Sequence, residues 1–334
     1  MPSETPKLHA ATSGEWTQLL SQTESDYALS QTFEFGATLG QAYPEYAHEP
    51  QIAEFSNGAR VLLPLVRVQS RLFRVFEAMP LSLNGLPIGI NASVAQISAA
   101  LNSISADVLR VSGGALSEAP PEISPAMERS MGETHVLDLS VGFDEIWTNN
   151  FGSKVRNQCR AAIKKGVETF EAQTPAEFDD YYEIYVKNCA RWGYDAPPYP
   201  RALFRELCEL RRQNNGEGVQ LQLARVEDET VAGVLLFHGR RSVLYWSGGM
   251  KREFSSLSPN NALLEVVIRQ ACECGHRLFD FGASGPLDSV RKFKESFGAQ
   301  TVNFPIWSRQ SARYGLVQRA RATLKRAPAT EVSA

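Results

Sequence analysis

The sequence lacks the features that would place it in a membrane or in an oxidising compartment. No run of its 334 residues approaches the roughly 20 apolar residues that a membrane-spanning helix needs. Residues 1–10 are polar and include two prolines, so they do not resemble a secretory signal. The five cysteines are odd in number, none precedes Cys159, and none has the paired spacing of a zinc site. We therefore expect a cytoplasmic protein with reduced, buried, structural thiols and no membrane span.

The chain also has no excess of either charge and no metal-binding pattern. Lys and Arg total 34 and Asp and Glu total 37, so the formal net charge is −3. Dedicated nucleic-acid-binding domains usually carry a marked basic excess, which argues against a DNA-binding protein but allows a local basic groove. The five histidines show no metal spacing, and we expect no metal site. The hydrophobic fraction of 43% is that of an ordinary globular protein, and the length suggests about two domains.

The second half of the sequence changes from helical to strand periodicity in a clear order. Its apolar spacing, a capping box at Thr174 and Glu177, and a Pro at the first position of two helices predict the element boundaries. A Gly- and Ser-rich loop is expected over 248–258. The predicted order is helices over 151–165, 174–193 and 203–210, strands over 219–226, 231–237 and 242–247, a helix over 258–275, a strand over 277–281, a helix over 289–297 and a strand over 301–307.

The first half shows a fainter version of the same order. Helical patterns cover 15–20, 33–39 and 93–104, and strand patterns cover 50–55, 60–68, 72–78, 107–111 and 135–139. The two halves match in pattern and not in sequence identity. We therefore predict an α/β (α+β) protein with two copies of one unit, each a mostly antiparallel mixed sheet flanked by helices. The predicted units are residues 1–140 and 141–310, followed by a basic tail over 311–334.

Four motifs of the second half have a recognisable family pattern. They are the basic segment from Lys154 to Val167, the helix start Ser258-Pro259-Asn260, the strand end Phe279-Asp280-Phe281-Gly282, and Phe293-Lys294-Glu295-Ser296-Phe297-Gly298. Together with the element order, these motifs resemble the Fem-type (FemAB-like) branch of the GNAT acyltransferase superfamily. The resemblance covers about residues 20–308, and the second half carries nearly all of its specificity.

This resemblance implies transfer of an acyl or aminoacyl group from an activated carrier to an amine of a small molecule or cell-envelope precursor. Peptidoglycan-bridge members take aminoacyl-tRNA as the donor substrate, whereas other members of the superfamily take acyl-CoA, and no cofactor stays bound. Residues 248–258 do not match the Arg/Gln-x-x-Gly-x-Gly/Ala phosphate loop of acetyl-CoA enzymes, and the negative net charge argues against tRNA. A non-catalytic ligand- or partner-binding protein on the same scaffold is the alternative.

The candidate donor site surrounds the loop predicted after the third strand of the second half. Gly248 and Gly249 allow a ligand to approach the backbone closely. The helix that begins at Ser258 and Asn260 offers N–H groups and a positive dipole end to a phosphate. Lys251 and Arg252 add positive charge, and Phe293 is expected to pack against a base or sugar of the carrier. The competing interpretation of the loop is a flexible, solvated hairpin connection.

Lys294 is the main catalytic candidate, because a lysine there can stabilise a developing oxyanion or hold a carrier phosphate. The competing interpretation is a short amphipathic helix whose phenylalanines face the core while Lys294 is solvated. Asp280 is the candidate base for the amine proton. A strand-end aspartate more often caps the following loop, so both roles stay open for Asp280.

A positive stripe and an aromatic pair complete the predicted substrate-binding residues. Arg156, Arg160 and Lys164 form the stripe on the first helix of the second half, which suits phosphate, a tRNA backbone or a nucleotide-linked precursor unless it is merely solvated. Lys154 of the same helix joins Arg156 and Arg160 as a predicted substrate-binding residue. Tyr245 and Trp246 are neighbours in a strand and so face opposite ways, which predicts one in the core and one lining the acyl pocket. The basic tail either reinforces a polyanion site or is a frayed terminal helix.

Overall fold

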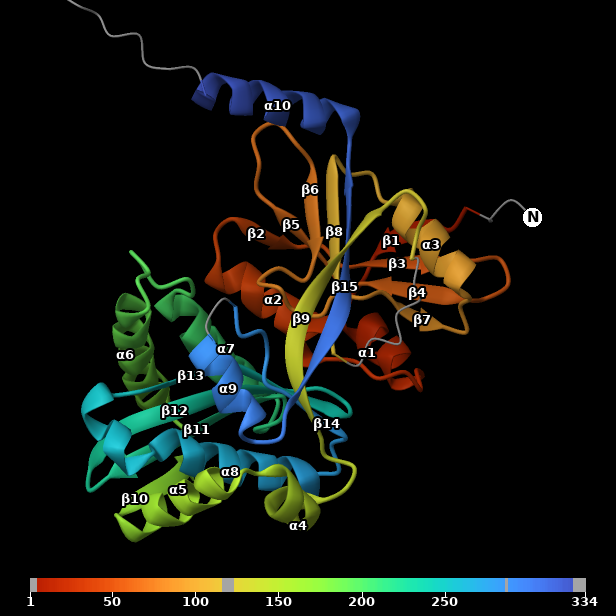
Figure 1. Ribbon diagram of the computed structural model, residues 1–334. Coiled ribbons are helices and arrows are strands. Elements are labelled where there is room, and N and C mark those ends of the chain that lie inside the picture. The colour runs from red at the N-terminus through yellow and green to blue at the C-terminus, as the bar shows by residue number, and fades with distance from the viewer. Residues whose placement is uncertain (1–4, 116–122, 286–287, 327–334) are drawn as a thin grey trace, which may run out of the picture.

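The computed structural model describes residues 5–115, 123–285 and 288–326, which form one long sheet and one small sheet flanked by helices (Figure 1). The small sheet has the order β1 (Lys7–Ala10), β3 (Gln51–Glu54), β4 (Arg60–Leu63) and β7 (Ile88–Ile90). The long sheet has eleven strands, and the strand pairs in it are antiparallel except for β13 with β14 and β6 with β8. Its order is β10 (Val167–Glu171), β11 (Val219–Val226), β12 (Glu229–His238), β13 (Ser242–Met250), β14 (Leu278–Asp280), β9 (Glu128–Asp138), β15 (Gln300–Gln310), β8 (Val108–Ser112), β6 (Val75–Ala78), β5 (Leu65–Val68) and β2 (Tyr46–His48).

Helices cover both faces of the β10–β14 part of the long sheet. On one face α5 (Ser153–Lys164) and α8 (Pro259–Glu273) enclose an apolar core, and on the other face α6 (Pro175–Arg191) and α7 (Arg201–Gln213) enclose a second core. The remaining helical segments are α1 (Ser13–Ser21), η1 (Leu29–Gln31), α2 (Phe33–Ala42), α3 (Val94–Ser103), α4 (Phe143–Glu145), η2 (Ile146–Asn150), η3 (Arg252–Leu257), α9 (Asp288–Glu295) and α10 (Ala312–Arg326). The α/β class and the flanked, mostly antiparallel sheet that the sequence predicted are confirmed.

Local sequence signals explain most helix ends, with some corrections. The predicted capping box of α6 is present, because Thr174 accepts from the Glu177 N–H and Glu177 accepts from the Thr174 N–H. Gly166 has φ +82°, as a residue that ends α5 requires. Ser153 is not a cap, since Gly152 occupies that position. The helical spacing of apolar residues predicts that Ile163 and Trp192 face the core, but they are 62% and 44% exposed, so this prediction is wrong.

The two halves of the chain share the long sheet. Strand β15 lies between β9 and β8, and β9 pairs in turn with β14, so the sheet continues across the division predicted at residue 140. The single strand predicted over 60–68 is two strands in different sheets, β4 and β5, which Pro64 separates. Proline has no N–H to donate to a strand ladder, which accounts for the break. The assignment of separate roles to residues 1–140 and 141–310 stays a prediction.

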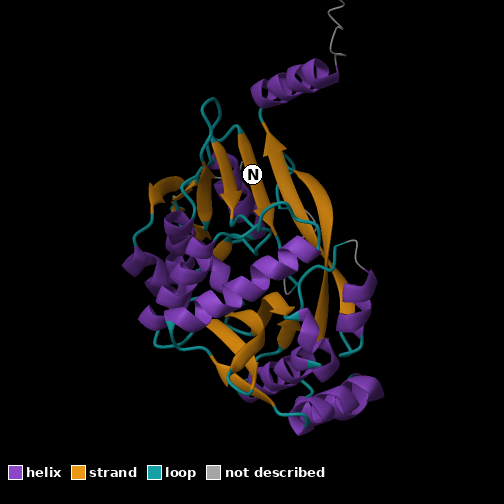
Figure 2. Cartoon of the chain, turned by 90° about the vertical axis from the view of Figure 1, so that its left-hand side faces the viewer, coloured by secondary structure: helices purple, strands orange, loops and turns teal. Residues whose placement is uncertain are grey.

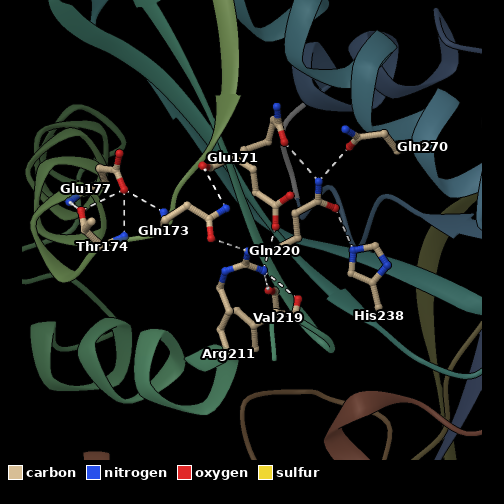
Figure 3. Close-up of polar contacts among 11 residues, drawn as sticks. Glu171, Gln173, Thr174, Glu177, Arg211, Val219, Gln220, His238 and Gln270 are labelled. Carbon is tan, nitrogen blue, oxygen red and sulfur yellow. Dashed lines mark hydrogen bonds and ion pairs between the residues drawn. The ribbon is translucent and has the colours of Figure 1, made fainter. Parts of the chain in front are cut away.

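Two groups of polar contacts lie around the start of β11, one centred on Arg211 and one on Gln220 (Figure 3). Arg211 of α7 donates to the carbonyls of Gly216 and Val219 and pairs with Glu171. The Gln220 side chain contacts Gln270 of α8 at 2.8 Å and His238 at 2.8 Å. Burial lowers the pKa of His238 to about 4, so this imidazole is neutral at neutral pH. These contacts give hydrogen-bond partners to the buried side chains of Arg211 and Gln220.

The described residues can be searched for membrane-spanning helices, metal clusters and paired cysteines. In that part of the chain no helix has both the length and the apolar character that crossing a membrane requires. No cluster of three or more potential metal ligands occurs there either. All five cysteines are unpaired, and Cys274 is exposed, so the prediction that it is a buried thiol is wrong.

Candidate functional site

Strands β13 and β14 lie side by side for three residues and then separate. Residues 242–244 pair in parallel with residues 278–280, whereas β13 continues along β12 to Met250. The register of β13 against β12 shifts at Trp246, which faces no residue of β12 in the described ladder. Such a bulge bends the strand and leaves one residue outside the ladder. The free edge of β13 therefore opens beside the chain that follows β14.

The two glycines predicted to lie in a ligand-binding loop are instead part of β13. Gly248 pairs with Val234 and Gly249 with Gly233 of β12. A Cβ on Gly248 would lie 1.7 Å from the Tyr245 hydroxyl, and one on Gly249 would lie 3.1 Å from Asn188 Nδ2. The prediction of a loop at Gly248 and Gly249 is wrong, because packing against neighbouring side chains explains why these residues are glycines.

We expect Gly248→Ala to lower the free energy of unfolding by about 1–3 kcal/mol, the usual cost of overpacking a buried site. The added methyl group collides with the buried Tyr245 phenol, which has no room to withdraw. Urea unfolding measures the change. Gly14→Ala is the control, because nothing lies within 4 Å of the added carbon and the helix start tolerates alanine. Equal stability of the two variants would show that the Tyr245 hydroxyl does not lie over Gly248.

Lys294 reaches from α9 to the point where β13 and β14 separate. Its Nζ donates to the carbonyls of Gly282 at 2.7 Å and Ala283 at 2.8 Å, and the residue is only 3% exposed. Gly282 lies against β13, since a Cβ there would be 3.4 Å from the Tyr245 carbonyl oxygen. Burial lowers the pKa of Lys294 to about 8, an effect that the nearby Asp280 carboxylate opposes. The interpretation of Lys294 as a solvated surface lysine is therefore wrong.

Asp280 belongs to the same buried polar cluster, which consists of Thr134, His135, Asp280, Ser284 and Lys294. Asp280 accepts from the Thr134 hydroxyl and, at 2.8 Å, from the Gly282 N–H, so it also caps the turn that follows β14. Burial raises the pKa of Asp280 despite these hydrogen bonds and the positive charge of Lys294. Burial thus favours the neutral form of both Asp280 and Lys294.

Three members of the polar cluster were not predicted from the sequence. Thr134 and His135 lie on β9, about 146 positions before their partners. His135 is fully buried with Nδ1 3.3 Å from Ser284 Oγ, and its Nε2 has no partner among the described residues. No local pattern marks Thr134 or His135, because only the pairing of β9 with β14 brings them to Asp280, and Ser284 is distinguished only by its contact with His135.

A basic groove of about 510 Å³ runs along one face of α5, beside the end of η3 and the residue that precedes α8. Lys165 Nζ donates to the Ser256 carbonyl at 3.1 Å, and Lys154 is exposed beside it. No carboxylate lines the groove in the described part of the chain. The first turn of α8 adds the positive end of the helix dipole, which suits a phosphate, although Pro259 has no N–H and the N–H groups of Asn261 and Ala262 donate to the Ser258 carbonyl. The lining residues are Ser153, Lys154, Asn157, Gln158, Ala161, Lys165, Ser256, Leu257 and Ser258.

The groove includes two predicted residues, Lys154 and Ser258, and borders a third, Asn260. Ser258 does not cap α8 as predicted, because it has a left-handed backbone with φ +56° and makes no side-chain cap bond. Asn260 follows Pro259 in the first turn of α8, and its Oδ1 is buried without a partner among the described residues. Lys165 was not predicted as a site residue. Its spacing of four residues from Ala161 places both on one helix face, and this spacing could have indicated that Lys165 lines the groove.

Other predicted cations lie away from the groove or have structural partners. Arg156 donates to the carbonyls of Trp147, Thr148 and Phe151, and so stabilises the end of η2. Arg160 lies 5.4 Å from the centroid of the Trp147 ring. Lys251 pairs with Glu229 at 2.5 Å, and Arg252 is exposed at the start of η3. Arg156 and Arg160 of the predicted stripe thus contact protein groups, whereas Lys164 is exposed, and a role of the stripe in substrate binding stays a prediction.

The predicted aromatic residues all pack against the two cores. Tyr245 and Phe293 pack against the α5–α8 core, whereas Trp246 packs against the α6–α7 core and lies 4.2 Å from the Tyr199 ring. Tyr245 and Trp246 thus face opposite sides of the sheet, as their strand position predicted. Tyr245 and Trp246 each pack against a core, so the structure does not distinguish which of them lines an acyl pocket.

Residues 153–295 match the sequence profile of the family described as Acetyltransferase (GNAT) domain. The chain contains a GNAT acetyltransferase domain. This domain includes the basic groove, the diverging strands and three members of the polar cluster, Asp280, Ser284 and Lys294. The other two, Thr134 and His135, lie before the GNAT domain in sequence. The resemblance that the second half showed is confirmed.

Solved structures show the same fold over nearly the whole chain. The crystal structure of FemX has a TM-score of 0.71 at 12% identity and covers 94% of this chain and 99% of its own. The C-terminal domain of a putative lysylphosphatidylglycerol synthetase from Agrobacterium fabrum has a TM-score of 0.55 at 13% identity, with 94% and 98% covered. A tandem GNAT protein from the clavulanic acid biosynthesis pathway has a TM-score of 0.51 at 13% identity, with 90% and 97% covered. No curated protein matches the sequence significantly. At these identities the likeness concerns the fold.

Proposed function

We propose that the protein transfers an acyl or aminoacyl group from a phosphate-bearing carrier to an amine of a small molecule or cell-envelope precursor. The basic groove at the start of α8 carries this proposal, because it combines two lysines, a helix N-terminus and no carboxylate among the described residues. Strand β13 leads through η3 directly to this groove. A carrier held there can extend its activated carbonyl along the free edge of β13 toward the polar cluster.

Side chains, more than backbone, are proposed to hold the carrier phosphates. The N–H groups of Phe254 and Ser258 are used within η3, where they donate to the carbonyls of Lys251 and Ser255. Segment 248–258 therefore does not form a loop of free N–H groups, and the charge comes from Lys154 and Lys165. The GNAT domain favours acyl-CoA as the donor, and the Fem-type resemblance favours aminoacyl-tRNA. Both donors bring phosphates to the groove.

The polar cluster supplies the groups that amide formation needs. The amine nitrogen bonds to the carbonyl carbon, and the carrier's sulfur or oxygen leaves with the electrons of the bond that breaks. The Lys294 ammonium stabilises the negative charge that develops on the carbonyl oxygen. The ionised form of Asp280 accepts the proton that the amine loses. Burial of the cluster strengthens both interactions, because water does not screen them there.

We expect the double variant Lys154→Ala/Lys165→Ala to weaken donor binding about tenfold, because it removes two charge-assisted contacts with phosphate. Thermal stabilisation of the protein by acetyl-CoA and, separately, by aminoacyl-tRNA measures binding and identifies the donor. Lys164→Ala is the matched control, since Lys164 is exposed on the same helix but does not line the groove.

Three outcomes of this experiment would count against the proposal. Stabilisation by neither donor would support the alternative of a non-catalytic binding protein on this scaffold. An equal loss of binding in the Lys164→Ala control would show that general surface charge, and not the groove, attracts the donor. Full binding by the double variant would place the donor phosphates elsewhere.

A further inference from the structure

The end of the molecule opposite the basic groove carries a projecting helix. Figure 1 shows α10 at the top, above β5, β6 and β8, and α5 and α8 at the bottom. Figure 2 shows that most of α10 extends beyond the body of the protein. Its start is anchored to the body of the protein. Arg313 donates to the Leu72 carbonyl at 2.8 Å, and the Tyr314 ring lies 4.9 Å from the Phe73 ring.

Two exposed leucines lie at this end of the molecule, one on each of the segments that meet there. Leu72, in the turn between β5 and β6, is 55% exposed, and Leu316, one turn after Arg313 on α10, is 65% exposed. Among the large apolar residues of the described chain, only Ile163 is comparably exposed, and the others are less exposed than Leu72. Arg313 joins the two segments through the Leu72 carbonyl, and Leu316 follows Arg313 by three residues on α10, so we group the two leucines as one region at this end of the molecule. We call it the tip surface and define it by Arg71, Leu72, Arg313 and Leu316.

The tip surface is surrounded by positive charge. Residues 312–326 contain five Lys or Arg residues and no Asp or Glu, although the whole chain has a net charge of −3. Arg71 is exposed beside Leu72. Of the carboxylates near it, Glu49 pairs with Arg67, whereas Asp107 accepts from the Arg74 N–H and the Ser311 hydroxyl and also interacts with Arg313. Asp107 therefore offsets part of the charge of Arg313, and the positive charge of this end comes from Arg71 and from the excess of Lys and Arg in residues 312–326.

We propose that the tip surface docks on an anionic lipid bilayer. Cations attract the negative headgroups, and the two leucines enter the boundary between headgroups and acyl chains, as in basic amphipathic helices that lie in the membrane interface. A nucleic-acid partner would use the arginines but leave two leucines in water, so the exposed leucines favour the bilayer. Docking at this end leaves the basic groove facing away from the membrane and open to a soluble donor. The inference does not depend on the proposed acyl transfer.

Vesicle sedimentation with the full-length protein tests the proposal. We expect at least tenfold tighter binding to vesicles of equal phosphatidylglycerol and phosphatidylcholine than to phosphatidylcholine alone, with the difference shrinking as salt is raised. The double variant Leu72→Asp/Leu316→Asp is expected to bind at least tenfold more weakly, because it removes the apolar contacts. Val141→Asp is the matched control, since Val141 is 50% exposed but lies outside the tip surface.

A second variant keeps the test decisive if the leucine variant is unstable. Arg319→Gln removes one charge from α10 and is expected to weaken binding about fivefold. Melting temperatures establish that each variant is folded. Equal binding to the two kinds of vesicle would overturn the proposal. So would a leucine variant that binds within twofold of the parent protein, or an α10 variant that loses binding to a labelled RNA while keeping binding to vesicles.

Discussion

Replacing Lys294 by methionine is expected to lower kcat/KM about 10²–10³-fold, the usual effect of removing one donor that stabilises an oxyanion. Methionine has a similar length but no charge, so the Gly282 and Ala283 carbonyls lose their partner and the developing oxyanion loses its cation. Donor binding should persist, because Lys294 is buried away from the residues that line the groove. Steady-state kinetics with the donor identified by thermal stabilisation measures the effect.

Lys292→Met is the control for this variant, because Lys292 lies two residues away on the same helix but is exposed. It should keep activity within twofold. A Lys294→Met protein that is folded and retains activity within a few fold would remove Lys294 from the proposed mechanism.

The pH dependence of activity gives an independent check on Lys294. Burial lowers its pKa to about 8, so the ammonium form is present at neutral pH and is lost as the pH rises through 8. Activity should therefore fall above about pH 8, and the residual activity of Lys294→Arg should lack this fall, because a guanidinium stays protonated. A parent profile that is flat between pH 7 and 10 would contradict the assignment.

The same pKa shift affects stability with a definite sign. Above pH 8 the native state gives up the Lys294 proton, whereas the unfolded state keeps it to about pH 10.4. The unfolded state then binds more protons, so this group makes stability rise with pH within that window. Lys294→Met should lose this contribution, which denaturant unfolding at several pH values would show.

A chain consisting of residues 1–140 alone is expected not to fold. Its strands β9 and β8 are neighbours of β15 and not of each other, and β15 is formed by residues 300–310. Without β15, the N–H and C=O groups along the facing edges of both strands are unpaired, and unpaired buried backbone groups are costly. Circular dichroism and heteronuclear NMR of the isolated segment would show a chain without cooperative unfolding.

A chain that ends at Ser311 is the control for this second experiment. It keeps β15 and loses only α10, which is anchored at its start and otherwise projects from the body. We expect it to fold and to unfold cooperatively. A soluble, cooperatively folded segment 1–140 would contradict the shared sheet and support two independent units.

The elements of the second half could be predicted because their signals act within a few residues. The capping box at Thr174, the proline at the start of α8 and the left-handed glycine that ends α5 each decide a boundary through contacts in one turn. The family motif around Lys294 likewise indicated an acyltransferase domain from a short stretch. The prediction of a loop at Gly248 was wrong. This residue lies inside a strand and is a glycine because the Tyr245 side chain packs against it, not because the chain must be flexible there.

The sequence by itself determined the helices and strands of the GNAT domain, its class of chemistry and Lys294 as the residue to examine, since these depend on local spacing and motif. Only the tertiary structure decided that Lys294 is buried, that Asp280 meets Thr134 and His135 from β9, and that Lys165 joins Lys154 in one groove. It also decided that Arg156 binds carbonyls of its own chain. The reason is that strand order and helix packing bring distant residues together, and a residue's burial and charge environment follow from those neighbours.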